Sequence, residues 1–232
     1  RQMENLKFCV FGDSVGKGVV LSETGRYTSG APDITSLTGR TDITLENFSR
    51  FGFVTEKTLS LIEKCESDIA SSDAIFIEVG GNDCDFDWQS ISDAPEEEHL
   101  CKTPPALFEK IYTALLTKAK AFGAKVFALN LPPIVPARYF KKITEKAGMC
   151  AENVLRWLGS VETIYRYQEM YSIMVEKTAR AVGVALIDIR SAFLADHHYE
   201  ELICEDGIHP NSKGYELIYK SVIEQYLAIE ST

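Results

Sequence analysis

The sequence predicts a three-layer α/β/α sandwich with a central, mainly parallel sheet of five strands. Short apolar runs rich in β-forming residues alternate along the chain with longer segments whose apolar residues recur at helical spacing. This alternation is typical of a parallel sheet that helices cover on both faces. A chain of 232 residues can bury the core of one such domain, so we expect a single domain over residues 1–232.

Five apolar runs are expected to form the strands. The first ends at Gly12, and a Gly-Asp-Ser turn follows it at once. The third, which leads into Val79-Gly-Gly-Asn-Asp83, is the clearest. The predicted strands are 6–12, 43–48, 73–79, 125–131 and 184–189. Right-handed crossovers between parallel strands would place all their carboxyl ends, and the turns that follow them, on one edge of the sheet.

Four helices are expected between and after these strands. Their predicted ranges are 54–66, 104–122, 162–182 and 212–227. Gly123 and Gly183 follow two of them, at the position where glycine commonly ends a helix.

Three segments show no sustained periodicity. Residues 16–44 are rich in Gly, Thr and Ser and predict a short helix and a surface loop. Segment 84–103 is acidic and loop-like, and segment 134–160 is partly basic and weakly periodic. Each of these last two carries one tryptophan, Trp88 and Trp157, which either supplies a flat substrate-binding wall for a sugar ring or acyl chain or anchors the core.

Composition restricts the partners. The formal charge of −10, without a cluster of Lys and Arg, argues against binding to nucleic acid and against electrostatic docking onto anionic membranes. No apolar run approaches the roughly 20 residues that cross a bilayer. The aromatic content of 10% is compatible with a monomer or a homodimer.

The cysteines and the first residues bear on the compartment. The six cysteines show no C-x-x-C spacing, so we expect reduced thiols and no zinc or redox motif. The first residues lack the apolar core of a secretory signal, which favours the cytoplasm. The alternative is a secreted protein whose signal peptide precedes this sequence.

The turn after the first strand invites a phosphate-loop interpretation. Gly12-Asp-Ser-Val-Gly-Lys17 has only three residues between its first glycine and its Gly-Lys pair, where a phosphate loop has four. Gly18 stands where that loop has Ser or Thr for magnesium. A nucleotide-binding switch is therefore disfavoured.

The same turn satisfies the G-x-S-x-G pattern of the α/β-hydrolase nucleophile elbow. In that fold several strands precede the elbow, whereas this chain has room for only one before Ser14. The match to this pattern is interpreted as accidental.

A third interpretation depends on residues elsewhere in the chain. Gly12-Asp-Ser14, Gly52, Gly-Gly-Asn82-Asp and Asp206-Gly-Ile-His209-Pro follow one another over most of the sequence. In this order they resemble the motifs of the SGNH hydrolases, also called the GDSL lipase/acylhydrolase family. The resemblance implies a flavodoxin-like fold and a serine esterase that acts on a small-molecule ester without a metal or cofactor.

Three residues are candidates for nucleophilic catalysis. A serine hydroxyl is a weak nucleophile and needs a base, which in turn needs orienting. Asp206 and His209, three residues apart on a turn, can point the same way, with the carboxylate on one ring nitrogen and Ser14 on the other. We therefore expect Ser14 as nucleophile, His209 as general base and acid, and Asp206 as the orienting carboxylate, and the resemblance implies the same roles.

The oxyanion of the tetrahedral intermediate needs donors already in place. The Asn82 amide, the Gly52 backbone N–H and the Ser14 backbone N–H fit this need, and the resemblance assigns them to it. Asp13 and Asp83 are expected to brace their turns through backbone hydrogen bonds.

The sequence is compatible with several classes of ester substrate. An acetyl or other short-chain ester, carried on a carbohydrate or another neutral group, is preferred because the acidic segment 84–103 disfavours anions. The alternatives are a lysophospholipase or thioesterase of the same family, or a catalytically silent carbohydrate-binding protein on this scaffold.

Overall fold

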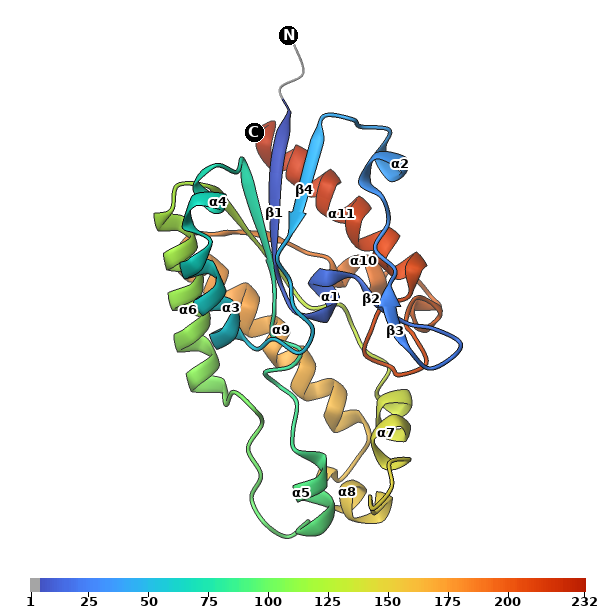
Figure 1. The fold of residues 1–232 in the computed structure, drawn as a ribbon. Helices are drawn as coiled ribbons and strands as arrows, with labels where there is room; N and C mark the ends of the chain where they lie inside the picture. The colour runs from blue at the N-terminus through green and yellow to red at the C-terminus, as the bar shows by residue number, and fades with distance from the viewer. Residues whose placement is uncertain (1–4) are drawn as a thin grey trace.

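The computed structural model describes residues 5–232 and confirms the α/β fold. A five-stranded sheet in the order β4-β1-β5-β6-β7 forms its centre, and every pairing within it is parallel (Figure 1). The strands are β1 (Leu6–Gly12), β4 (Ile43–Asn47), β5 (Ala74–Glu78), β6 (Lys125–Leu129) and β7 (Ala185–Ile187).

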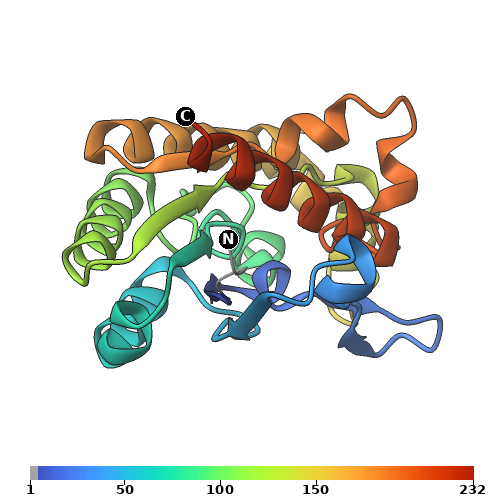
Figure 2. The same ribbon diagram turned by 90° about the horizontal axis from the view of Figure 1, so that it is seen from above.

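Helices pack on both faces of this sheet. One face is covered by α3 (Thr55–Lys64), α4 (Glu66–Ala70), α6 (Pro105–Ala121) and α9 (Glu162–Val182). The other is covered by α2 (Ile34–Thr38), α10 (Arg190–Leu194) and α11 (Ser212–Glu230), near a short 3₁₀ helix, η1 (Tyr199–Leu202). Seen from above, α3 and α6 lie on one side of the strands and α11 on the other (Figure 2).

Side chains alternate between the two faces along each strand, as the strand geometry requires. In β1, Cys9 and Phe11 join the core under α3, α6 and α9, whereas Phe8 joins the core under α11. In β5, Ile75 and Ile77 likewise join the core under α3, α6 and α9, whereas Phe76 joins the core on the other face. Because both faces are covered, these strands are apolar throughout rather than alternating with polar residues.

The carboxyl ends of the strands carry additional helices. Helices α5 (Trp88–Asp93), α7 (Pro136–Thr144) and α8 (Ala151–Leu158) gather beyond that edge of the sheet, at the bottom of Figure 1. Two of them lie in the segment 134–160 and one in 84–103, so both segments are more helical than the sequence pattern indicates. Their helices are six to nine residues long, too short for a clear period.

Segment 16–44 also contains more structure than predicted. Beside α1 (Ser14–Lys17) and α2 it forms an antiparallel hairpin of β2 (Val19–Leu21) and β3 (Tyr27–Ser29). Each strand has only three residues, which explains why no alternation is visible in the sequence. The other predicted strands and helices are present, with ends shifted by a few residues.

All six cysteines are free thiols, and only Cys150 is exposed. Within residues 5–232, every helix is too short or too polar to span a bilayer.

The end of β1 depends on a glycine. A Cβ added at Gly12 would lie 2.0 Å from the backbone oxygen of Glu78 on β5, a distance that demands a shift of the strand. We predict that Gly12→Ala lowers the free energy of unfolding by about 2–4 kcal/mol, measured by urea denaturation. Gly81→Ala is the matched control, because its Cβ would meet only Asp13 Oδ2 at 3.8 Å. Equal stability of the two variants would contradict the prediction.

Candidate active site

Ser14 lies at the carboxyl edge of the sheet, directly after β1. It is the first residue of α1, and the side chain of Asp13 caps that helix by accepting a hydrogen bond from the Val15 N–H at 2.9 Å. Gly18 ends α1 in the left-handed conformation, with a φ of 81°. This four-residue helix between a strand end and a glycine holds the Ser14 hydroxyl, largely buried, at the base of a cavity.

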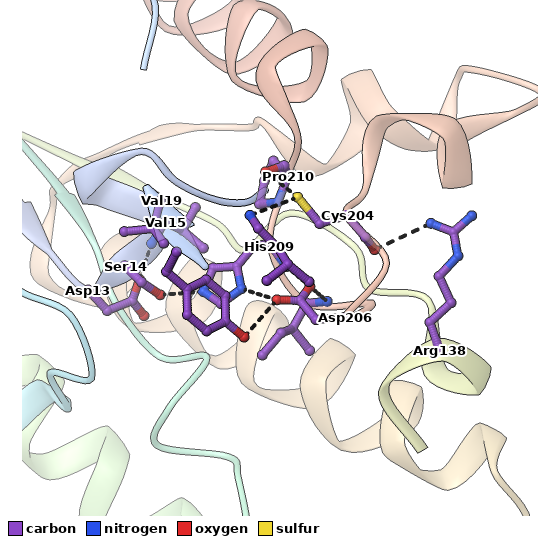
Figure 3. A network of polar contacts seen from close by, with 12 residues as sticks. Asp13, Ser14, Val15, Val19, Arg138, Cys204, Asp206, His209 and Pro210 are labelled. Atoms are coloured by element: carbon purple, nitrogen blue, oxygen red, sulfur yellow. Dashed lines mark hydrogen bonds and ion pairs between the residues drawn. The ribbon is translucent and has the colours of Figure 1, made fainter. Parts of the chain in front are cut away.

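The structure brings His209 and Asp206 to Ser14 from the other end of the chain (Figure 3). Ser14 Oγ lies 2.9 Å from His209 Nε2, and His209 Nδ1 lies 2.6 Å from Asp206 Oδ2. With its proton on Nδ1, the imidazole donates to Asp206 and leaves Nε2 free to accept from the serine. This is the geometry in which a base can take a hydroxyl proton.

Asp206 is fully buried and is held by its own turn. Its Oδ1 accepts hydrogen bonds from the backbone N–H groups of Ile208 and His209, each at 3.1 Å. Burial by itself raises the pKa of this carboxyl, but the hydrogen bond and charge of His209 and these N–H groups outweigh burial and lower the pKa below its ordinary value. Asp206 therefore stays ionised, as an orienting carboxylate must.

Tyr27, on β3, is a further partner of Asp206. Its hydroxyl donates to Asp206 Oδ2 at 3.1 Å, and its ring centroid lies 5.2 Å from that of His209. Burial, followed by the charge of Asp206, raises the pKa of Tyr27 to about 12, so the phenol keeps its proton at neutral pH. Tyr27 is not among the predicted site residues, because segment 16–44 has no periodicity or motif that points to a role for it.

The predicted oxyanion donors lie on the same edge. Asn82 and Gly52 both line the cavity with Ser14, and Gly52 adopts a φ of 75° in the turn after β4. The Asn82 amide donates one hydrogen bond to the Phe53 carbonyl at 3.0 Å, which orients its second N–H. As the first residue of a helix, Ser14 has no intrahelical acceptor for its backbone N–H.

Two aspartates brace these turns, as expected from their positions. Asp13 accepts from Val15, and both oxygens of Asp83 lie 3.1 Å from the Thr55 N–H. Asp83 is completely buried and connects the turn after β5 to the start of α3.

The cavity above Ser14 has a volume of about 160 Å³. Its wall is strongly aromatic, and none of the described residues that line it is Lys or Arg. The aromatic residues that line it are Tyr27, Phe51, Phe86, Trp88, Tyr139 and Tyr167. Phe86 and Trp88 come from segment 84–103 and Tyr139 from α7, so the additional helices build one side of the cavity.

The two tryptophans differ in position. Trp88 lines the cavity but is buried, and its Nε1–H donates to Asp85 Oδ1 at 2.9 Å, which also accepts from the Tyr139 hydroxyl at 2.8 Å. Trp157 lies outside the cavity lining and packs edge-on against Phe86, with centroids 4.9 Å apart. The exposed aromatic side chains beside His209 are instead Tyr27 and Phe51, and Phe51 could have been suspected from its place next to Gly52.

The remaining histidines lie outside this arrangement. His99 contacts the Ala94 carbonyl, and His197 and His198 are exposed. Among residues 5–232, no group of three or more His, Cys, Asp and Glu side chains is arranged to hold a metal ion.

The chain is similar in sequence to one protein family and in fold to several solved structures. The sequence model of the GDSL-like lipase/acylhydrolase family matches residues 10–217. Comparison with curated protein sequences gives no match.

Several solved structures share the fold. A catalytic mutant of the acetylxylan esterase Axe2 from Geobacillus stearothermophilus superposes with a TM-score of 0.63 at 16% identity, over 95% of this chain and 94% of that one. The lipase/acylhydrolase from Enterococcus faecalis superposes with a TM-score of 0.59 at 18% identity, over 95% of this chain and 94% of that one. The psychrotrophic esterase EstA from Pseudoalteromonas sp. superposes with a TM-score of 0.60 at 16% identity, over 99% of this chain and 100% of that one.

The Tyr27 hydrogen bond predicts a measurable effect on turnover. Tyr27→Phe removes the donor to Asp206 and keeps the ring, so kcat should fall roughly three- to tenfold, in line with one hydrogen bond of about 0.5–1.5 kcal/mol. Steady-state kinetics with p-nitrophenyl acetate would measure it. Tyr199→Phe is the control, because the Tyr199 hydroxyl donates to the Ile134 carbonyl rather than to Asp206. Equal kcat in both variants would rule out this role for Tyr27.

Proposed function

The chain belongs to the GDSL-like lipase/acylhydrolase family and is a hydrolase of ester bonds, and on this premise we propose that it is a serine esterase that forms an acyl-enzyme on Ser14. The observation that carries the proposal is the hydrogen-bonded triad of Ser14, His209 and Asp206. Ser14 Oγ lies 2.9 Å from His209 Nε2, and His209 Nδ1 lies 2.6 Å from Asp206 Oδ2. Its members come from opposite ends of the sequence, and all three are buried.

The reaction follows from the arrangement of this triad. His209 Nε2 takes the proton of Ser14 Oγ while the oxygen attacks the ester carbonyl carbon. The imidazolium then gives that proton to the departing alcohol as the bond between the acyl carbon and the alcohol oxygen breaks. Water attacks the acyl-enzyme with His209 again as base, and release of the acid restores the serine.

Three donors support the proposed oxyanion site. The Asn82 amide and the backbone N–H groups of Ser14 and Gly52 all belong to residues at the cavity wall. Because they are held in place before the substrate binds, they can stabilise the developing negative charge without reorganisation.

The cavity favours a small neutral substrate. Its volume of about 160 Å³ is below the roughly 300–1,000 Å³ of sites for drug-sized ligands. The carboxyl groups of Asp13 and Asp85 line it, and no Lys or Arg among the described residues does, which disfavours an anionic headgroup. We therefore propose an acetyl or other short-chain ester, with a sugar or similar neutral alcohol seated against Tyr27 and Phe51.

The first test is burst kinetics with p-nitrophenyl acetate and longer acyl homologues. We expect a burst in the wild type, loss of roughly 10⁴-fold or more in kcat for Ser14→Ala and His209→Ala, and a preference for short acyl groups. Folding of both variants is checked by circular dichroism. Turnover that survives in Ser14→Ala would exclude the acyl-enzyme on this residue.

The second test concerns the oxyanion. Asn82→Ala should lower kcat by about 10²–10³ with little change in KM, because the amide acts on charge that develops only in the transition state. Asn153→Ala is the matched control, since the Asn153 amide on α8 donates to the Ser92 carbonyl on α5, and neither residue lines the cavity. An Asn82→Ala enzyme as active as the control would remove Asn82 from the mechanism.

A further inference from the structure

Two buried carboxyl groups lie side by side beneath the turn that carries Ser14. Asp13 and Glu78 are each 2% exposed. The register of β1 and β5 places Gly12 opposite Glu78, and the Asp13 N–H donates to the Glu78 carbonyl at 3.2 Å. The strands therefore hold the two side chains next to each other.

The part of the chain that the structure describes supplies no Lys or Arg as an ion-pair partner of these two carboxyl groups. None of the ion pairs among residues 5–232 includes Asp13 or Glu78. The titratable groups around the pair are His209 before α11, Tyr215 on α11, Tyr112 on α6, and Asp83 after β5. Of these only His209 can carry a positive charge.

The pair therefore needs a proton of its own. Two carboxylates confined together in one buried site repel each other, and they can share a hydrogen bond only when one of them is protonated. Oε2 of Glu78 is buried without a donor, which is unfavourable for a carboxylate and acceptable for an acid that carries its own proton.

The surroundings indicate which residue holds the proton. Burial raises the pKa of Asp13 to about 6, although the hydrogen bond from the Val15 N–H opposes the rise. Burial also raises the pKa of Glu78 well above its ordinary value, and the neighbouring charge of Asp13 raises it further. Asp13 accepts from the Val15 N–H, as a carboxylate does, whereas Oε2 of Glu78 has no donor, so we assign the proton of the pair to Glu78.

We propose that Glu78 is a protonated positioning residue, whose carboxylic acid donates to the Asp13 carboxylate so that Asp13 can cap α1 and hold Ser14 in place. Asp13 then accepts from two sides, from Glu78 and from the Val15 N–H at 2.9 Å. The catalytic consequence rests on the proposed role of Ser14, whereas the protonation of Glu78 does not.

The shared proton makes the turn sensitive to alkali. Loss of the proton places two negative charges in one buried site, which disfavours the geometry of the turn. Because the folded-state pKa of Glu78 exceeds its unfolded value, its contribution to stability is greatest below the unfolded value and declines as the pH rises towards the folded one.

The protonation is tested on the protein without substrate. Infrared difference spectroscopy at neutral pH should show the carbonyl band of a carboxylic acid in the wild type, and this band should be missing in Glu78→Gln. Urea denaturation should show the wild type losing stability relative to Glu78→Gln as the pH is raised from about 4 to 8. Absence of both the band and the pH-dependent difference would overturn the proposal.

The positioning is tested by the rate at which a p-nitrophenyl phosphonate labels Ser14. Glu78→Leu, which removes the donor, should label roughly 10- to 100-fold more slowly. Glu78→Gln keeps a donor that does not titrate, so its rate should fall only a few-fold, without the decline at alkaline pH that the wild type shows. Glu46→Gln, on the exposed side of β4, is the matched control and should follow the wild type.

The outcomes separate the two proposals. Labelling that persists in Ser14→Ala would contradict the proposed function, and the infrared band would still decide the protonation of Glu78. Normal labelling in a folded Glu78→Leu would overturn the positioning role while leaving Ser14 as nucleophile. If Glu78→Leu does not fold, the labelling rate of Glu78→Gln at alkaline pH decides. A decline of this rate equal to that of the wild type would overturn the proposal.

Discussion

The approach of Gly12 to the carbonyl of Glu78 is the constraint on which the site depends. Side chains at this point would separate the ends of β1 and β5, so the last residue of β1 has none. The next backbone N–H can then bond to Glu78, and the chain turns into α1 with Ser14 at its start. Asn82 comes four residues after Glu78, so the same contact brings nucleophile and proposed oxyanion donor to one place.

The acidic groups around this contact serve different purposes because their environments differ. Asp206 is surrounded by donors, and these keep its pKa low despite complete burial. Asp13 and Glu78 have few donors and face each other, so burial dominates and raises the pKa of both. Environments that push carboxyl pKa values in opposite directions are a common way to combine charged and neutral acids in one active site.

The additional helices beyond the strand ends give this chain its particular cavity. Helices α5 and α8 pack together, and the carboxylate of Asp85 joins Trp88 to Tyr139 on α7. This network closes one side of the cavity with buried aromatic side chains. The opposite side, formed by the hairpin residue Tyr27 and by Phe51, is exposed beside His209. The cavity therefore has one closed wall and one open side, a shape that suits the short-chain ester proposed as its substrate.

What the sequence by itself determined was the alternation of strands and helices and the turns at the strand ends. Apolar runs of five to seven residues and helices of ten or more leave clear periods, and Ser14, Asn82 and His209 occur in motifs whose resemblance to those of a known family implies a role. The tertiary structure alone decided the rest. Tyr27 reaches Asp206 across 179 positions, and Glu78 meets Asp13 through strand register, so neither contact leaves a local pattern. Likewise, Trp88 and Trp157 are equivalent in sequence, and only packing directs one towards the cavity and the other away from it.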